Sequence, residues 1–225
     1  MTLSIVARCA QTGQFGVAIT SSSPAVAARC AFARAGVGAV ATQNVTNPAL
    51  GPAVLAALSG GAYAKAALAQ ALEAEAFPDY RQVLVVDRAG GTAIHSGARA
   101  LGIWAEAQGR DCAAGGNLLA HDGVPAAMVA AFGAAKGSLG GRLVTALQAG
   151  IAAGGEAGPV HSAGLLVAHE QAWPYAELRI DWLDEGCPVE AVARAWAVFA
   201  PQAEAYVTRA LDPTAAPSYG VPGDE

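Results

Sequence analysis

Thr2 stands where a hydroxyl could act as a nucleophile. A threonine hydroxyl attacks a carbonyl only when a base takes its proton. An N-terminal threonine carries that base in its own α-amine, whose pKa is ordinarily about 8. Removal of Met1 would make Thr2 the first residue, and a small second residue favours that removal. Because many proteins begin with these two residues and have no catalytic threonine, Thr2 needs support from its surroundings.

The surroundings of Thr2 offer a hydroxyl and a cation. Residues 3–8 (LSIVAR) and 14–20 (QFGVAIT) predict a hairpin around a polar loop, and this pairing places Thr2 opposite Ser21. The Ser21 hydroxyl would orient the amine or relay its proton. We expect Arg34 near Thr2, where a cation would keep the amine neutral and the alkoxide charged. The structural alternatives are a serine-rich turn before Pro24 and a surface arginine.

Other segments that resemble ligand-binding or catalytic motifs are incomplete. The segment GAAKGSLGGR, which contains Lys136, lacks the residue order of a phosphate-binding loop, and AGVGAV lacks a dinucleotide fingerprint. No G-x-S-x-G elbow occurs, and the four histidines are far apart without an H-E-x-x-H motif. We therefore expect no metal and no cofactor. Four scattered cysteines without a C-x-x-C pair predict reduced thiols.

Composition limits the class of protein. The 225 residues are 54% hydrophobic and only 14% charged, with a net charge of −5 and no basic run. This excludes a disordered chain and argues against nucleic acid or an anionic membrane as main partners. We found no transmembrane segment or signal peptide, so we expect a cytoplasmic protein with a small-molecule substrate. The high apolar content predicts a homodimer or larger homo-oligomer.

The elements expected around Thr2 alternate between hairpins and helix pairs. Strands are predicted at 3–8, 14–20, 36–44, 80–97 (a hairpin turning at 89–91), 162–170 and 176–183. Helices are predicted at 47–61, 62–76, 124–137, 138–155 and 188–207. Hairpins do not form a parallel sheet, so the expected fold is α+β: a four-layer αββα sandwich of two antiparallel sheets. We expect one domain over 1–210, an extended tail over 211–225, and the first hairpin at the centre.

The sequence also resembles a prokaryotic family of unknown function placed in the Ntn-hydrolase-like superfamily. The similar stretches run from residue 2 to about 183, and FARAGVGAVATQNVTNPALGP and GGNLLA are the most specific. The resemblance implies the same sandwich and a nucleophile at the start of the first strand, which is Thr2. It implies Arg34 as the basic residue. Its candidates for oxyanion or substrate binding are Gln43, Asn44, Asn117 and Ser162.

The chain departs from the family's usual residues in two turns. The turn before SAGLLV contains Val160 and His161 where the family usually has Arg and Gln, and SSSP lacks a basic or aromatic residue. Two functions remain open. One is a hydrolase of small amide-type C–N bonds that acts through an acyl-enzyme on Thr2, with Thr2 at the mouth of a cleft. The other is a non-catalytic Ntn-like fold that binds a metabolite or serves as an assembly subunit.

Overall fold

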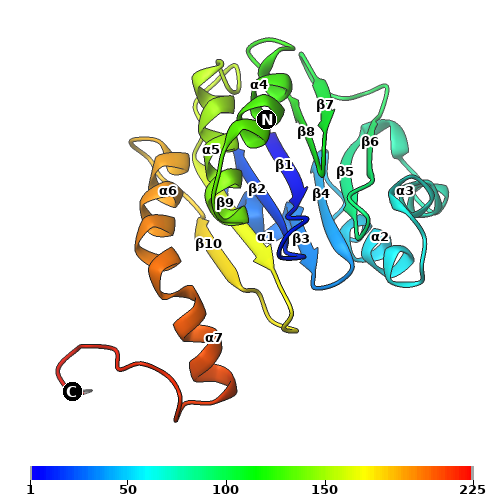
Figure 1. The fold of residues 1–225 in the computed structure, drawn as a ribbon. Coiled ribbons are helices and arrows are strands. Elements are labelled where there is room, and N and C mark those ends of the chain that lie inside the picture. Colours follow the sequence, from blue (N-terminus) through cyan, green and yellow to red (C-terminus); the bar gives the residue numbers. More distant parts are fainter. Residues whose placement is uncertain (1, 224–225) are drawn as a thin grey trace.

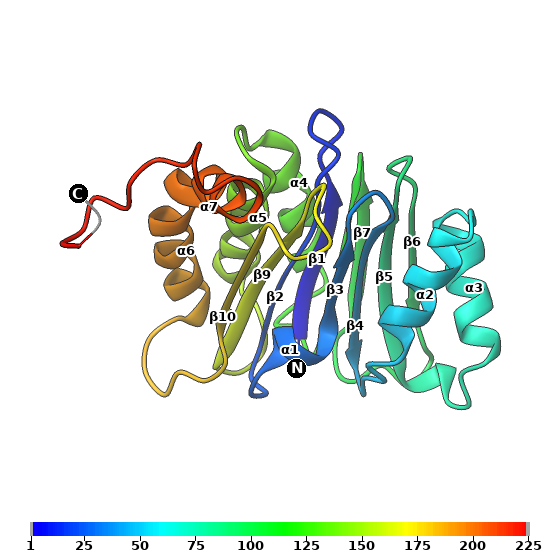
Figure 2. The same ribbon diagram turned by 90° about the horizontal axis from the view of Figure 1, so that it is seen from below.

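Two antiparallel β-sheets face each other in the computed structural model, which describes residues 2–223 (Figures 1 and 2). The six-stranded sheet has the order β10-β9-β2-β1-β8-β7 and the four-stranded sheet the order β3-β4-β5-β6. The strands of the first sheet are β1 (Thr2–Arg8), β2 (Phe15–Ser21), β7 (Ala105–Gly109), β8 (Cys112–Asn117), β9 (Ser162–Ala168) and β10 (Ala176–Ile180). Those of the second are β3 (Ala31–Arg34), β4 (Gly38–Asn44), β5 (Arg81–Asp87) and β6 (Thr92–Ser96).

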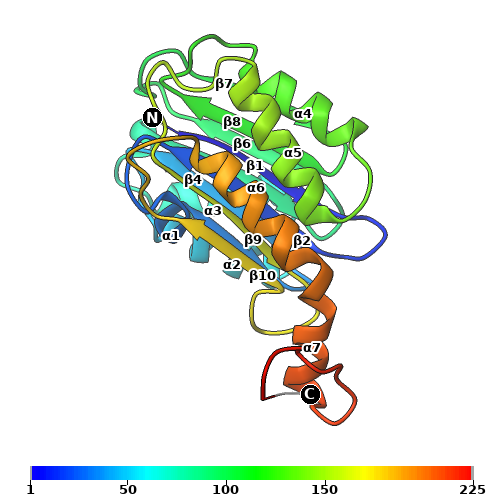
Figure 3. The same cartoon turned by 90° about the vertical axis from the view of Figure 1, so that its left-hand side faces the viewer.

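Helices cover the outer faces of both sheets, which gives the expected αββα sandwich. Figure 2 shows the four layers edge-on, and Figure 3 looks onto the helices that cover the six-stranded sheet. These are α4 (Val124–Ala134), α5 (Leu139–Ala152) and α6 (Pro188–Phe199). The four-stranded sheet is covered by α2 (Leu50–Ser59) and α3 (Ala64–Glu73). The remaining helices are α1 (Val26–Cys30) and α7 (Ala203–Leu211), with 3₁₀ turns at Pro78–Tyr80 and Ala200–Gln202.

The first hairpin lies at the centre of the larger sheet, as predicted. Strand β1 pairs with β2 on one side and β8 on the other, and both of its faces are buried. Leu3 and Ile5 pack against the helices, whereas Val6 packs into the apolar layer between the sheets. A strand that is apolar on both faces can occupy only such a position without exposing hydrophobic surface.

The structure adds elements that propensity did not predict. The β7–β8 hairpin is rich in alanine and glycine, which are weak strand formers, so β8 is held by pairing with β1, and β7 by pairing with β8, rather than by local preference. The short α1 and β3 fill the segment before the predicted strand at 36–44.

The single helix predicted over 188–207 is divided into α6 and α7. Pro201 lies in the 3₁₀ turn between them, because proline has no N–H to continue the α-helical ladder. Helix α7 and the segment after it project from the sandwich (Figures 1 and 3). That segment bends back onto α7, where the Arg209 guanidinium lies 3.7 Å from the centroid of the Tyr219 ring.

Candidate functional site

The apolar layer between the two sheets becomes polar at one end. Side chains alternate along a strand, so Thr2 and Ser4 share the face of Val6 and point between the sheets. On the opposing sheet, Gln43 and Gln82 likewise continue the inward-facing rows of β4 and β5. All four side chains are at most 6% exposed. Buried polar side chains are stable only when they are hydrogen-bonded: Ser4, Gln43 and Gln82 bond one another, and Thr2 bonds Ser21.

Thr2 begins strand β1 and lies among hydroxyl and amide groups. Its Oγ1 is 3.2 Å from Ser21 Oγ, which also accepts a hydrogen bond of 3.0 Å from the Ser23 amide. The pairing of β1 with β2 places Ser21 opposite Thr2, as the hairpin predicted. On its other side Thr2 pairs with Asn117 of β8. Thr2 is 6% exposed, so the expectation that it lies at the mouth of an open cleft is not met.

An amide network connects the two sheets beneath Thr2. Ser4 Oγ donates to Gln43 Oε1 at 2.6 Å, and Gln43 Nε2 donates to Gln82 Oε1 at 2.7 Å and to the Gly115 carbonyl at 3.1 Å. Asn117 Nδ2 also donates to Gln82 Oε1, at 3.1 Å. Both N–H hydrogens of Gln43 are therefore used within the network, whereas the Asn117 amide has a second one.

Two acceptor atoms at this end have no hydrogen-bond partner among the described residues: Asn117 Oδ1 and Glu156 Oε1. Asn117 is fully buried and Glu156 is 6% exposed. A buried acceptor without a donor costs about 1–3 kcal/mol, so such atoms are rare in folded proteins. Both atoms would be satisfied by a ligand or a chain terminus that supplies N–H groups.

Glu156 reaches this region from the turn before β9. The bridge between Glu156 and Leu119 joins this turn to the segment that follows Asn117. Glu156 Oε2 accepts a hydrogen bond of 3.3 Å from the Ser22 amide, next to Ser21. Burial raises the pKa of the Glu156 carboxyl to about 7, because it penalises the charged form. Glu156 is therefore a second titratable group near Thr2, and it changes charge near neutral pH.

Ser162 and Asn44 lie at the same end, but backbone contacts engage their side chains. Ser162 Oγ donates to the Ser23 carbonyl at 2.6 Å and accepts from the Val26 amide at 3.3 Å, which fixes the turn after β2. Asn44 has a left-handed φ of 71°. Its amide nitrogen donates to the Tyr80 carbonyl at 2.7 Å, and its oxygen accepts from the Leu101 amide at 3.2 Å. Ser162 therefore has no further hydroxyl donor, and Asn44 alternates with Gln43 along β4, so its side chain lies on the face of the strand opposite the layer between the sheets.

Arg34 lies at the opposite end of the sheets from Thr2, which corrects the expectation that it stands beside the nucleophile. Strand β3 runs away from the Thr2 end, and Arg34 pairs with Gly38, at the far end of β4 from Gln43. Arg34 instead lines a surface hollow with Ala168 and Pro174. Arg34 follows β2 closely in the sequence, but α1 reverses the chain before β3 begins, so β3 carries Arg34 away from Thr2.

Residues 2–192 match the Family of unknown function (DUF1028). The chain belongs to this family. Its fold matches the crystal structure of another DUF1028 protein, SPO2555 from Silicibacter pomeroyi, with 28% sequence identity and a TM-score of 0.82. That match covers 88% of this chain and 85% of SPO2555. No curated protein is detectably similar to this chain.

Two Anbu (ancestral β-subunit) structures are also similar, at a lower level. The protein from Yersinia bercovieri has a TM-score of 0.38 and 10% identity, with 91% of this chain and 97% of that chain covered. A Gly-1 mutant from Hyphomicrobium sp. strain MC1 has a TM-score of 0.41 and 12% identity, with 92% and 99% covered. At these TM-scores the likeness carries no argument about this DUF1028 member.

The sequence analysis missed three residues of the polar end: Ser4, Gln82 and Glu156. Strand alternation could have identified the first two, because Ser4 shares a face with Thr2, and Gln82 shares one with Leu84 in an otherwise apolar strand. Glu156 lies in the turn before β9, and only tertiary contact brings it near β1. Among residues 2–223, no three His, Cys, Asp or Glu side chains are grouped closely enough to hold a metal ion.

Proposed function

We propose that this DUF1028 protein is a hydrolase of small amide-type C–N bonds, with Thr2 as an N-terminal nucleophile once the Met1–Thr2 peptide bond is cleaved. The observation that carries the proposal is the fully buried Asn117 Oδ1, on the residue paired with Thr2, which has no hydrogen-bond partner among residues 2–223. Cleavage would create a Thr2 amine at the start of β1, and an amine supplies the donors that this acceptor lacks.

The reaction follows from these groups. The neutral Thr2 amine takes the hydroxyl proton as Oγ1 attacks the substrate carbonyl, which forms a tetrahedral oxyanion. The oxyanion collapses, the C–N bond breaks, and the ammonium returns the proton to the departing amine. Water, deprotonated by the same amine, then attacks the Thr2 ester and releases the acid. Ser21 Oγ, 3.2 Å from Thr2 Oγ1, lies where it can relay the proton.

Asn117 is the best placed of the side chains considered for the oxyanion. Gln43 uses both N–H hydrogens inside the network, Ser162 donates to a backbone carbonyl, and Asn44 lies on the other face of β4 from Gln43. Asn117 faces the network and has a second N–H that donates to no acceptor among residues 2–223. A preorganised donor of this kind typically contributes about 100-fold or more to kcat. Because Thr2 is 6% exposed before cleavage, the proposal also requires that cleavage opens a path to Oγ1.

The test combines intact mass with turnover. We expect natively expressed protein to lack Met1, and the processed protein to hydrolyse at least one compound in a panel of small amides and ureido compounds. Thr2→Ala should abolish turnover, whereas Thr2→Ser should retain part of it. Thr145→Ala, at an exposed helical threonine, is the matched control and should behave as wild type.

Substitution of Asn117 separates its role from that of Thr2. Asn117→Leu preserves the side-chain shape but removes the N–H donors, so kcat should fall about 100-fold while the protein remains folded. Equal turnover by wild type and Thr2→Ala would exclude Thr2 chemistry. Retention of Met1 in native protein would do the same, and either result would favour a binding or assembly role for this fold.

A further inference from the structure

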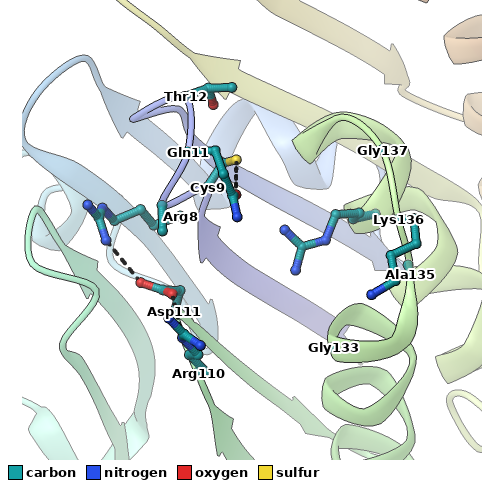
Figure 4. Close-up of a pocket in the computed structure, with 12 residues that line it drawn as sticks. Arg8, Cys9, Gln11, Thr12, Arg110, Asp111, Gly133, Ala135, Lys136 and Gly137 are labelled. Atoms are coloured by element: carbon teal, nitrogen blue, oxygen red, sulfur yellow. Dashed lines mark hydrogen bonds and ion pairs between the residues drawn. The ribbon is translucent and has the colours of Figure 1, made fainter.

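A basic cavity of about 560 Å³ lies at the other end of β1 from Thr2 (Figure 4). Three loops enclose it: the β1–β2 loop, the β7–β8 turn and the α4–α5 connection. A seven-residue strand separates Thr2 from Arg8, which is about 20 Å at ordinary strand rise. This cavity is therefore distinct from the polar end that contains Thr2.

The cavity concentrates positive charge on an acidic protein. Arg8, Arg110, Lys136 and Arg142 line it together with one acid, Asp111, although the whole chain has a net charge of −5. Asp111 is 3.1 Å from Arg8 Nη1 and 3.7 Å from Arg110 Nε. Neither Lys136 nor Arg142 forms an ion pair with any residue that the structure describes. One carboxylate thus leaves most of the positive charge unbalanced.

Arg142 and Lys136 form one wall of the cavity, on the α4–α5 side, and the Arg142 side chain is held in place. Its Nη2 donates to the Phe132 carbonyl at 3.2 Å, and its guanidinium carbon lies 4.0 Å from the centroid of the Phe132 ring. Its Nε is buried and has no hydrogen-bond partner among the described residues. The carbonyl and the ring of Phe132 hold this guanidinium in place, and a guanidinium that is fixed in this way with an unused donor is preorganised to bind an anion.

The opposite wall is formed by Arg8, at the end of β1, and by Arg110 and Asp111 in the β7–β8 turn. Figure 4 shows Arg8, Asp111 and Arg110 on one side of the cavity and Lys136 on the other, with Gln11 and Thr12 near the β1–β2 loop. Asp111 has a left-handed φ of 59° in the β7–β8 turn, and its carbonyl accepts from the Arg8 amide at 2.9 Å. Basic residues therefore border the cavity on both sides, although the Arg8 guanidinium is directed away from Lys136 and is held by Asp111.

We propose that this cavity binds a small organic polyanion whose phosphate or carboxylate groups span the two basic walls. Its volume falls in the range of pockets for metabolite-sized ligands and exceeds what a single phosphate needs. Its lining residues include no aromatic side chain, so recognition rests on charge and on the polar groups of Gln11 and Thr12 rather than on ring stacking.

The test is calorimetric titration of the full-length protein with two probes, pyrophosphate and citrate, at low and at physiological salt. Binding of pyrophosphate but not citrate would identify a phosphate ligand, and the reverse a polycarboxylate. Lys136→Glu should weaken binding of the preferred probe at least tenfold, because the new carboxylate cancels the remaining positive charge of Arg142 on that wall. Lys65→Glu, at an exposed lysine on α3, changes net charge equally and should leave the affinity unchanged.

Arg110→Ala provides a second variant that removes an exposed charge without a packing role, and it should weaken binding severalfold. Three results would overturn the proposal: no heat from either probe at millimolar concentration, unchanged affinity in Lys136→Glu, or equal weakening by Lys65→Glu. The last would show that binding follows overall charge rather than this cavity. None of these results bears on Thr2 chemistry, so the two proposals can fail separately.

Discussion

At the residue scale, the carboxyl of Glu156 is the most unusual group at the polar end. It is almost fully buried, one oxygen accepts from the Ser22 amide, and the other has no hydrogen-bond partner among residues 2–223. A carboxylate in such a place is stable only near positive charge or when protonated. The raised pKa, about 7, expresses that cost and makes the native state sensitive to pH.

We predict that wild type loses stability relative to Glu156→Gln as pH rises from 5 to 8. An unfolded glutamate deprotonates near 4.5, whereas the folded carboxyl keeps its proton until about 7. The folded state therefore binds more protons in that window, and the free energy of unfolding falls as pH rises through it. The difference should reach up to about 3 kcal/mol at pH 8. Urea titrations at pH 5 and 8 measure it.

The control for this titration is Glu170→Gln, at an exposed glutamate. It should show the same pH dependence as wild type. If Glu156→Gln and wild type have parallel stability curves between pH 5 and 8, the carboxyl is not the source of the effect.

Hairpin pairing predicted that Ser21 lies beside Thr2, and their hydroxyl oxygens are 3.2 Å apart, because strand register is a local property. The family resemblance directed attention to Asn117 and Gln43, which both bond Gln82, and their catalytic roles stay predictions. The prediction that Arg34 lies beside Thr2 was wrong, because the position of Arg34 depends on the chain reversal at α1, which no periodic sequence pattern predicts. Glu156 was missed because the contact between its turn and the end of β8 joins segments far apart in sequence.

At the element scale, close approach between strand and helix depends on glycines in the sheets. A Cβ added at Gly164 of β9 would lie 2.4 Å from Ala27 Cβ of α1 and 3.1 Å from the Leu178 carbonyl. Helix α1 directly follows the turn that Ser162 and Ser21 hold. Gly164 thus determines how closely α1 packs behind the Thr2 end.

We predict that Gly164→Ala lowers the free energy of unfolding by about 1–3 kcal/mol, the usual cost of overpacking. Gly133→Ala is the matched control, because a Cβ at this position of α4 meets no atom within 4 Å and alanine favours helix. It should be neutral or slightly stabilising. Denaturant unfolding compares the two variants. Equal stability of both would show that α1 moves aside for the new methyl group without a loss in the free energy of unfolding.

The sandwich itself was predictable because each apolar hairpin and amphipathic helix has a local signal. The β7–β8 hairpin was not, because alanine and glycine carry little strand preference. Its β8 is nevertheless a direct neighbour of β1 and supplies Asn117. A strand that forms by pairing with its neighbours, and not by the preference of its own residues, cannot be predicted from hydrophobic periodicity.

At the scale of the whole molecule, the α6–α7 end exposes apolar surface. Trp173, Val198, Tyr206 and Leu211 are between 41% and 68% exposed, and α7 projects from the sandwich (Figure 1). A monomer seldom leaves a large contiguous apolar patch in water, so this end is where we expect a second copy to bind. Among residues 2–223, no helix is long and apolar enough to cross a bilayer.

We predict that the protein is a homodimer at micromolar concentration and that Val198→Lys with Leu211→Lys makes it monomeric. Each lysine would place a charge in the buried part of the contact, which is unfavourable without a partner. Light scattering measures the mass. Val45→Lys, at an exposed valine after β4, serves as the control and should leave the dimer intact. A monomeric wild type would refute the prediction.

Strand β1 connects two ends with different chemistry, and alternation constrains its length in a particular way. Thr2, Ser4, Val6 and Arg8 share one face because the positions of the nucleophile candidate and of the arginine that borders the basic cavity differ by an even number. Insertion or deletion of one residue in β1 would turn one end toward α4 and α5 while the other stayed in place. A change of two residues would keep both on the inner face. Among natural DUF1028 sequences, length variation between these ends should therefore occur in pairs of residues.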